Sequence, residues 1–79
     1  MKNRIKVYRA MHDITQAELA KQVNVSRQTI VSIEKERHSL SLELAYRIAN
    51  YFQADITDVF PNPGNDDLED KNGSFFSAF

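Results

Sequence analysis

Residue types that cross-link small folds or interrupt helices are missing from most of this chain. The sequence has no cysteine, which excludes disulfides and thiolate metal sites. It has no glycine before residue 64, and its two prolines stand at positions 61 and 63. No apolar run approaches the ~18 residues of a membrane-spanning helix, and the first four residues lead into a charged pattern, unlike a signal peptide. We therefore expect a cytoplasmic protein that does not enter a membrane.

A large excess of charge of one sign is also missing. The net charge is −1, because 10 Lys and Arg residues oppose 11 Asp and Glu residues. Residues 1–60 hold nine basic and seven acidic side chains, whereas residues 61–79 hold Lys71 against four acidic side chains. The body is thus mildly basic and the tail acidic, a distribution that permits nucleic-acid binding without requiring it.

The side chains that catalysis needs do not come together in this sequence. No Ser/His/Asp set, glycine-rich phosphate loop or pair of convergent carboxylates can be assembled from it. His12 and His38 lie in different predicted loops, with no cysteine or carboxylate at ligand spacing. The sequence therefore predicts a protein that is not an enzyme and that carries no metal and no cofactor.

Hydrophobic periodicity predicts an all-α fold of five helices in one small domain. Helices are expected over residues 3–12, 16–22, 27–35 and 42–52, with Asn3 as the cap of the first. A short last helix is expected to begin after Asp55 and to stop at Pro61. The composition then changes to that of turns and linkers. We therefore divide the chain into a domain, residues 1–60, and an acidic, aromatic-ended C-terminal tail, residues 61–79.

Apolar side chains mark the inward face of each predicted helix. In the first helix, Ile5, Tyr8 and Met11 recur at a spacing of three. Glu34 adjoins the inward row of the third helix, an unusual place for a carboxylate without a partner. The other expected core positions are Ile14, Leu19, Ala20, Val23, Ile30, Ile33, Leu42, Leu44, Ala45, Ile48, Ala49, Phe52, Ile56, Val59 and Phe60.

The second and third predicted helices are joined by a tight turn, and each begins at a hydroxyl side chain. Thr15 stands three residues before Glu18, which is the spacing of a capping box. Ser26 can cap the next helix with its side-chain oxygen. Between the two helices lies Asn24, which tolerates a left-handed backbone better than most residues. This pattern is typical of a helix-turn-helix, a motif that binds DNA.

The pattern of residues 3–60 resembles the Cro/repressor type of helix-turn-helix domain, also called lambda-repressor-like or Xre family. Five linked phrases carry the resemblance through their order and spacing. They are Arg4-Ile5-Lys6-Val7-Tyr8-Arg9, Ile14-Thr15-Gln16-Ala17-Glu18-Leu19-Ala20, Val25-Ser26-Arg27-Gln28-Thr29-Ile30, Ile33-Glu34 and Ser41-Leu42-Glu43-Leu44-Ala45. The resemblance implies a compact five-helix bundle with its motif in the second and third helices.

The chain departs from the family in its loops. The family commonly places glycine at four helix ends, where this chain has Asp13, Asn24, Glu36 and Gln53. If these positions need a positive φ, Asp13 and Asn24 tolerate it moderately, while the other two cost about 1 kcal/mol each. The family's common proline before Ser41 is replaced by leucine. These differences affect the expected loop geometry more than the expected fold.

The resemblance also implies which residues contact DNA bases. In the family the third helix lies in the major groove, with its N-terminal side chains against base edges. By position, the base contacts fall on Arg27, Gln28, Val31 and Ser32. The chemistry agrees, because arginine can bond to guanine and glutamine to adenine through paired hydrogen bonds, and valine can contact a thymine methyl. The alternative is a solvated helix face without function.

Phosphate contacts and one structural ion pair are implied in the same way. The implied phosphate contacts are Gln16, Ser26, Thr29, Lys35, Arg37 and His38. For the last three, loose surface charges are an equal alternative, because such residues are abundant on any surface. Arg9 and Glu34 occupy the positions of a structural ion pair, which would explain the carboxylate beside the core.

The resemblance implies a sequence-specific, DNA-binding regulator of transcription, expected to be a repressor. One module of this size covers only about 600–1,000 Å² on DNA, so we expect a homodimer on a two-fold-related operator. The dimer surface is expected at Ile56, Val59, Phe60, Phe75, Phe76 and Phe79. Two alternatives stay open: an antitoxin or interaction module of the same fold whose tail binds a partner protein, and a bundle that has lost DNA binding.

Overall fold

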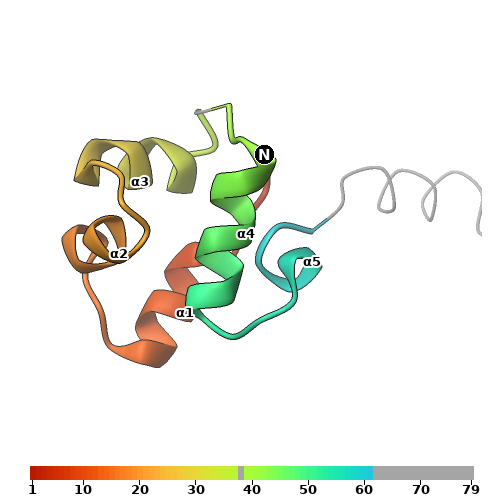
Figure 1. Ribbon diagram of the computed structural model, residues 1–79, viewed down its shortest axis with the longest axis horizontal. Helices are drawn as coiled ribbons and strands as arrows, with labels where there is room; N and C mark the ends of the chain where they lie inside the picture. Colours follow the sequence, from red (N-terminus) through yellow and green to blue (C-terminus); the bar gives the residue numbers. More distant parts are fainter. Residues whose placement is uncertain (38, 62–79) are drawn as a thin grey trace, which may run out of the picture.

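The computed structural model describes residues 1–37 and 39–61, which form five helices and no strand (Figure 1). α1 (Ile5–His12) and α4 (Leu42–Tyr51) lie in the middle of the bundle. α2 (Gln16–Gln22) and α3 (Arg27–Glu34) lie together on one side, and the short α5 (Ile56–Val59) lies on the other. The all-α, five-helix fold is confirmed. None of the described helices has the length and apolar character needed to cross a membrane.

Side-chain caps begin four of the five helices. At α2 the predicted capping box is present, because the Glu18 N–H donates to Thr15 Oγ1 at 3.0 Å and the Thr15 N–H donates to Glu18 Oε1 at 3.1 Å. Ser26 and Ser41 accept a backbone N–H at the starts of α3 and α4, and Asp55 caps α5.

The start of α1 differs from the prediction. The helix begins at Ile5, and its N-cap is Arg4, whose own side chain makes no cap hydrogen bond. Asn3 Oδ1 does accept the Ile5 N–H at 3.3 Å, but Asn3 Nδ2 donates to the carbonyl oxygen of Ile33 at 2.8 Å. Asn3 thus connects the beginning of α1 to the end of α3.

The four helix ends that lack glycine all adopt the left-handed backbone. The φ angles are 54° at Asp13, 62° at Asn24, 60° at Glu36 and 55° at Gln53. In each case the next residue donates its N–H to a carbonyl five positions earlier, as in the Schellman motif. These bonds run from Ile14 to Arg9, Val25 to Ala20, Arg37 to Ser32 and Ala54 to Ala49. These four helices therefore end in the left-handed conformation that glycine favours, at the cost of strain from a Cβ.

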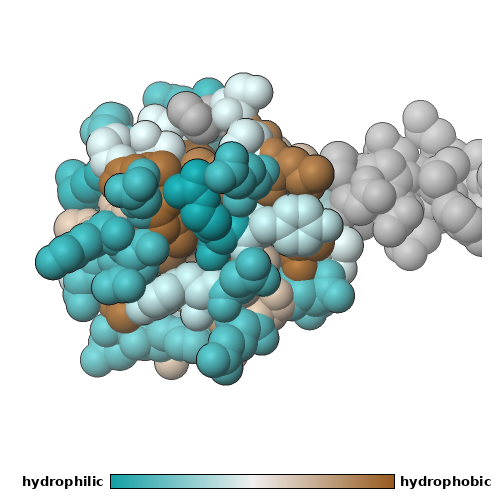
Figure 2. Space-filling view, viewed as in Figure 1, coloured by the Kyte–Doolittle hydropathy of each residue, from teal (hydrophilic) through white to brown (hydrophobic). Residues whose placement is uncertain are grey.

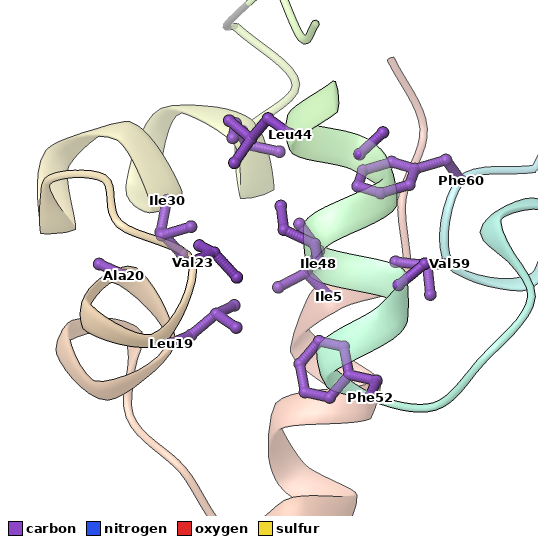
Figure 3. Close-up of a cluster of buried hydrophobic side chains, with 13 residues drawn as sticks. Ile5, Leu19, Ala20, Val23, Ile30, Leu44, Ile48, Phe52, Val59 and Phe60 are labelled. Atoms are coloured by element: carbon purple, nitrogen blue, oxygen red, sulfur yellow. The ribbon is translucent and has the colours of Figure 1, made fainter. Parts of the chain in front are cut away.

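All five helices contribute to one hydrophobic core (Figure 3). Its largest fully buried side chains are Ile5, Leu19, Val23, Ile30, Ile48 and Val59. Two predicted core positions were wrong: Met11 is 69% exposed and Leu42 is 68% exposed. At about 100° per residue, Met11 is turned some 120° away from Ile5, and Leu42 faces away from Leu44. A repeated spacing of three therefore drifts off one helix face, and a spacing of two crosses to the opposite side.

The predicted dimer surface needs a correction as well. Val59 is 0% exposed and Phe60 is 6% exposed, so both belong to the core of the single chain. The N-terminal segment is joined to this region, because the Arg4 N–H donates to the Val59 carbonyl oxygen at 2.8 Å. Ile56 is partly buried, and the other three predicted residues, Phe75, Phe76 and Phe79, lie outside the described residues.

Candidate nucleic-acid interface

The α2–turn–α3 unit presents one helix face to solvent. α2 packs against α3. The side chains of Ile30 and Ile33 extend from α3 into the core, where both are buried. The opposite face carries the predicted base-contacting residues. Arg27 and Gln28 are exposed, and Val31 and Ser32, one turn further on, are half-buried. The four residues form the strip expected from helical spacing, and Figure 2 shows polar side chains on the α2–α3 side of the molecule, with apolar ones among them.

An ion pair fixes α3 to α1 beneath this face. Arg9 Nε donates to Glu34 Oε2 at 2.7 Å, and Arg9 Nη2 donates to Glu34 Oε1 at 3.1 Å. The Glu34 side chain is only 3% exposed and that of Arg9 is 17% exposed. Arg9 Nη1 also donates to the carbonyl oxygen of Ile14 at 3.2 Å. The structure thus contains the predicted Arg9–Glu34 pair in a two-bonded geometry that favours both charges.

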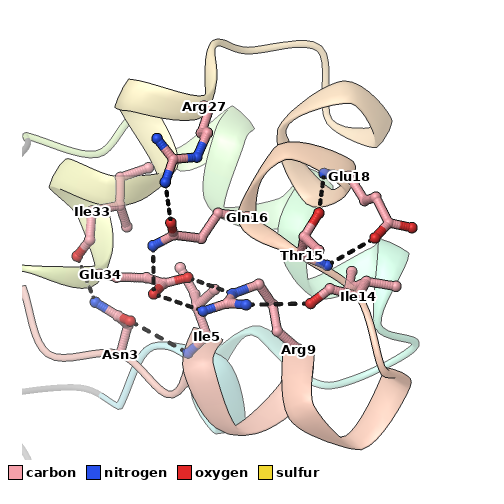
Figure 4. A network of polar contacts seen from close by, with 10 residues as sticks. All are labelled: Asn3, Ile5, Arg9, Ile14, Thr15, Gln16, Glu18, Arg27, Ile33 and Glu34. Atoms are coloured by element: carbon pink, nitrogen blue, oxygen red, sulfur yellow. Dashed lines mark hydrogen bonds and ion pairs between the residues drawn. The ribbon is translucent and has the colours of Figure 1, made fainter.

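Gln16 extends this pair towards the surface (Figure 4). Its Nε2 donates to Glu34 Oε1 at 3.2 Å, and its Oε1 accepts from Arg27 Nη2 at 3.3 Å. The amide can be oriented in no other way, because a carboxylate only accepts and a guanidinium only donates. Four side chains from α1, α2 and α3 therefore form one chain of hydrogen bonds, which we call the Arg27–Gln16–Glu34–Arg9 network.

The network leaves polar groups directed outwards. Gln16 Nε2 carries two hydrogens and uses one for Glu34, so the other is available to a phosphate oxygen. The surface beside Gln16 is hollowed, and the hollow is lined by Arg9, Thr15 and Arg27 together with Asp13, Ile14 and Ala17. Two guanidinium groups and an amide thus border this recess, which lies between the end of α1 and the starts of α2 and α3.

Ser26 and Thr29 form a hydroxyl pair at the start of α3. Ser26 Oγ accepts the Thr29 N–H at 3.1 Å, and the two hydroxyl oxygens lie 2.9 Å apart. One hydroxyl donates to the other, which leaves one hydroxyl hydrogen free for an external acceptor. The predicted roles of Ser26 as a helix cap and as a phosphate contact are therefore compatible.

Basic side chains follow the end of α3. Lys35 and Arg37 are exposed on either side of Glu36, which is exposed too. The Arg37 N–H donates to the Ser32 carbonyl oxygen at 2.9 Å, so the backbone that carries these charges is fixed to α3. His38 lies outside the described residues. The single acidic side chain between the two basic ones lowers the positive potential of this segment.

Two long-range hydrogen bonds that support the interface were missed by the sequence analysis, which named Asn3 only as a helix cap. Asn3 holds the end of α3 through the Ile33 carbonyl, as described above. Arg47 on α4 donates to the carbonyl oxygen of Val23, in the turn of the motif, at 2.8 Å. Neither has a recognisable signal in the sequence, because a polar residue at a helix edge looks the same with or without a distant partner. Among the described residues, no three His, Asp or Glu side chains are grouped as in a metal site.

Comparison with known proteins agrees with this geometry. Residues 5–59 match a family model described as helix-turn-helix. An uncharacterized HTH-type transcriptional regulator of Methanocaldococcus jannaschii is 53% identical over 60 residues, which cover 76% of this chain and 91% of the relative. Similar regulators occur in Archaeoglobus fulgidus, with 53% identity over 76% of this chain and 84% of the relative, and in Bacillus subtilis, with 42% identity over 76% and 91%.

Proposed function

On the premise that the chain belongs to the helix-turn-helix family of Cro/repressor type, we propose that it represses transcription by occupying operator DNA. That the chain is a DNA-binding transcriptional regulator follows from the family and its relatives. In the proposal α3 lies in the major groove and the protein has no catalytic role. Arg27 and Gln28 read base edges through hydrogen bonds, Val31 contacts a thymine methyl and Ser32 bonds to a neighbouring base.

The observation that supports the proposal most strongly is the Arg27–Gln16–Glu34–Arg9 network. It connects the first residue of α3 to the first residue of α2, so that a base-reading group and a phosphate-binding group share one hydrogen bond. Phosphate contacts set the register of a protein on DNA, and base contacts then read the sequence. Because hydrogen bonds to Glu34 and Arg27 already orient the Gln16 amide, its binding to DNA costs less conformational entropy.

The proposed phosphate contacts lie on both sides of the α3 face that carries the four proposed base contacts. Gln16 and the Ser26–Thr29 hydroxyl pair lie at the helix starts, and Lys35 and Arg37 follow the end of α3. Each of the two groups can bond to the DNA backbone on one side of a major groove. His38 remains a proposed contact from its position in the sequence alone.

Two copies of the chain are proposed to bind a two-fold-related operator. One module covers about 600–1,000 Å² on DNA, and tight specific binding needs more. The half-sites would then lie about one helical turn, roughly 34 Å, apart. Because Val59 and Phe60 are buried, the protein side of the dimer must use residues that are accessible in the single chain, such as Ile56.

Selection of bound sequences from random double-stranded DNA tests the proposal. The wild-type chain should enrich one motif, and Gln28→Ala should relax the preference at one position of each half-site, by about 1–3 kcal/mol. Lys35→Gln is the matched control, because losing a phosphate contact should weaken all sequences alike and reduce the salt dependence by about one ion. If the wild-type chain enriches no motif at low salt, the proposal is wrong.

The alternative of an antitoxin or interaction module depends on residues 61–79 binding a partner protein. No contact among residues 1–37 and 39–61 favours that alternative over DNA recognition. Co-purification of the native protein with a partner would support it, and it is compatible with DNA binding by α3.

A further inference from the structure

An apolar groove lies on the α5 side of the bundle, between the start of α4 and the end of α5. Its volume is about 270 Å³, and it is lined chiefly by Met1, Leu40, Leu42, Ala45, Ile56 and Phe60. Leu42 is 68% exposed and Met1 is 54% exposed. Figure 2 shows apolar surface in brown at this side of the molecule, next to the point where the described chain ends. Covering such a surface removes apolar area from water and is therefore favourable.

The described chain ends at the rim of this groove. Pro61 lines the groove, and it also lines a neighbouring hollow formed with Lys2, Asn3 and Arg4. Arg4 is fixed next to α5, because its Nη1 donates to the Asp58 carbonyl oxygen at 3.2 Å. An apolar groove and a basic hollow thus meet at the residue from which the tail begins.

The sequence of the tail matches these two surfaces in chemistry and in order. Four acidic residues fall within residues 66–70. Three of the five phenylalanines of the chain follow, at Phe75, Phe76 and Phe79. Residues 62–74 can extend over at most about 45 Å. That length is ample for a chain that starts at the rim of the groove to return to it.

We propose that the tail of each chain docks on its own domain, with its terminal phenylalanines in the apolar groove. The acidic run then lies against Lys2 and Arg4. Aromatic side chains bury about 150–250 Å² each and supply most of the interaction, and the exposed charges add a small, salt-dependent contribution. This inference does not depend on DNA binding.

The chain's own tail is favoured over that of a second copy by its attachment. Because only residues 62–74 separate the phenylalanines from the domain, covalent attachment gives the tail an effective concentration in the millimolar range, far above the protein concentration of a dilute solution. The docked tail would also cover Ile56, the residue of the predicted dimer surface that is partly exposed in the described part of the chain. Docking and association through α5 would therefore compete.

The absence of cysteine makes a direct test possible. Ser77→Cys in the full chain gives one attachment site for a nitroxide spin label beside the terminal phenylalanines. The label should broaden the methyl NMR signals of Leu40, Ala45 and Ile56, and it should leave that of Ala17, on α2, unchanged. The matched control carries the same label and replaces Phe75, Phe76 and Phe79 by serine. It should lose the broadening.

Two results would overturn the proposal. The first is a label at residue 77 that broadens no groove signal, or that broadens groove and α2 signals equally. The second comes from mixing isotope-labelled chains that lack the nitroxide with unlabelled chains that carry it. Broadening of the groove signals in that mixture would place the tail on a second copy instead of on its own domain.

Discussion

The two sides of the bundle are built from different interactions. On the α2–α3 side, polar side chains from three helices form the Arg27–Gln16–Glu34–Arg9 network above a buried carboxylate. On the α4–α5 side, the contacts of the described residues are mainly apolar, through Ile48, Phe52, Val59 and Phe60. There the surface keeps a groove and an exposed leucine.

The difference suits two kinds of recognition. Hydrogen bonds to base edges need donors held in fixed positions, and a fully satisfied polar network holds them so. An apolar groove needs no such orientation, because hydrophobic burial is not directional. The α2–α3 side is therefore suited to reading DNA, and the α4–α5 side to covering by an apolar segment.

The largest expected effect tests the polar side. Arg9→Met should lower the free energy of unfolding by about 3 kcal/mol, because it leaves the Glu34 carboxylate buried without its guanidinium. The double variant Arg9→Met/Glu34→Leu should cost less than this single replacement, because the uncompensated charge is gone. Urea unfolding measures both values.

The control for this prediction is the exposed pair on α4. Arg47 Nη2 lies 3.3 Å from Glu43 Oε1, with the two side chains 42% and 81% exposed. Glu43→Gln should therefore change stability by less than about 0.5 kcal/mol. Equally mild losses for the single and double changes at Arg9 and Glu34 would contradict a structural role for that pair.

A smaller effect, equal on both sides, is expected from the helix ends. Glu36→Gly, after α3, and Gln53→Gly, after α4, each remove a Cβ from a residue with left-handed backbone. Each change should stabilise the protein by about 1 kcal/mol. Asn24→Gly should gain less, since asparagine tolerates this conformation. Thermal unfolding measures the gains. Glu36→Ala is the control, and if it stabilised as much as Glu36→Gly, removal of charge rather than relief of strain would explain the effect.

Much of the fold could be predicted because its signals are local. The hydroxyl caps set the starts of α2, α3 and α4, and the helix ends fall within one residue of those expected. Exposure was harder to predict for Met11 and Leu42, which lie at apolar positions but point to solvent. Val59 and Phe60 show the reverse difficulty, because an apolar residue looks the same in the sequence whether it fills the core or a dimer interface.

The site was predictable only in part, for a related reason. The family resemblance placed Arg9 beside Glu34, and the structure contains that pair. Its extension through Gln16 to Arg27 depends on how three helices meet, and no periodicity encodes such a meeting. The bonds from Asn3 and Arg47 to distant carbonyls have the same origin. The base and phosphate contacts stay predictions until DNA is bound.

The smallest expected effect concerns the cap of α5, on the apolar side. Asp55 Oδ1 accepts the Thr57 N–H at 2.9 Å and the Thr57 hydroxyl at 2.8 Å, and these bonds lower the pKa of the Asp55 carboxyl below its usual 3.8. Because the folded-state pKa is the lower one, the charged cap contributes fully above the unfolded-state pKa, and its contribution is lost as the pH falls through the folded-state pKa. Asp55→Asn keeps an acceptor without the charge, so the loss of stability between the two pKa values should shrink in this variant. An NMR titration of the Asp55 carboxyl carbon gives the pKa directly. An unshifted pKa of Asp55 would show that this cap makes no pH-dependent contribution to the stability of the α4–α5 side.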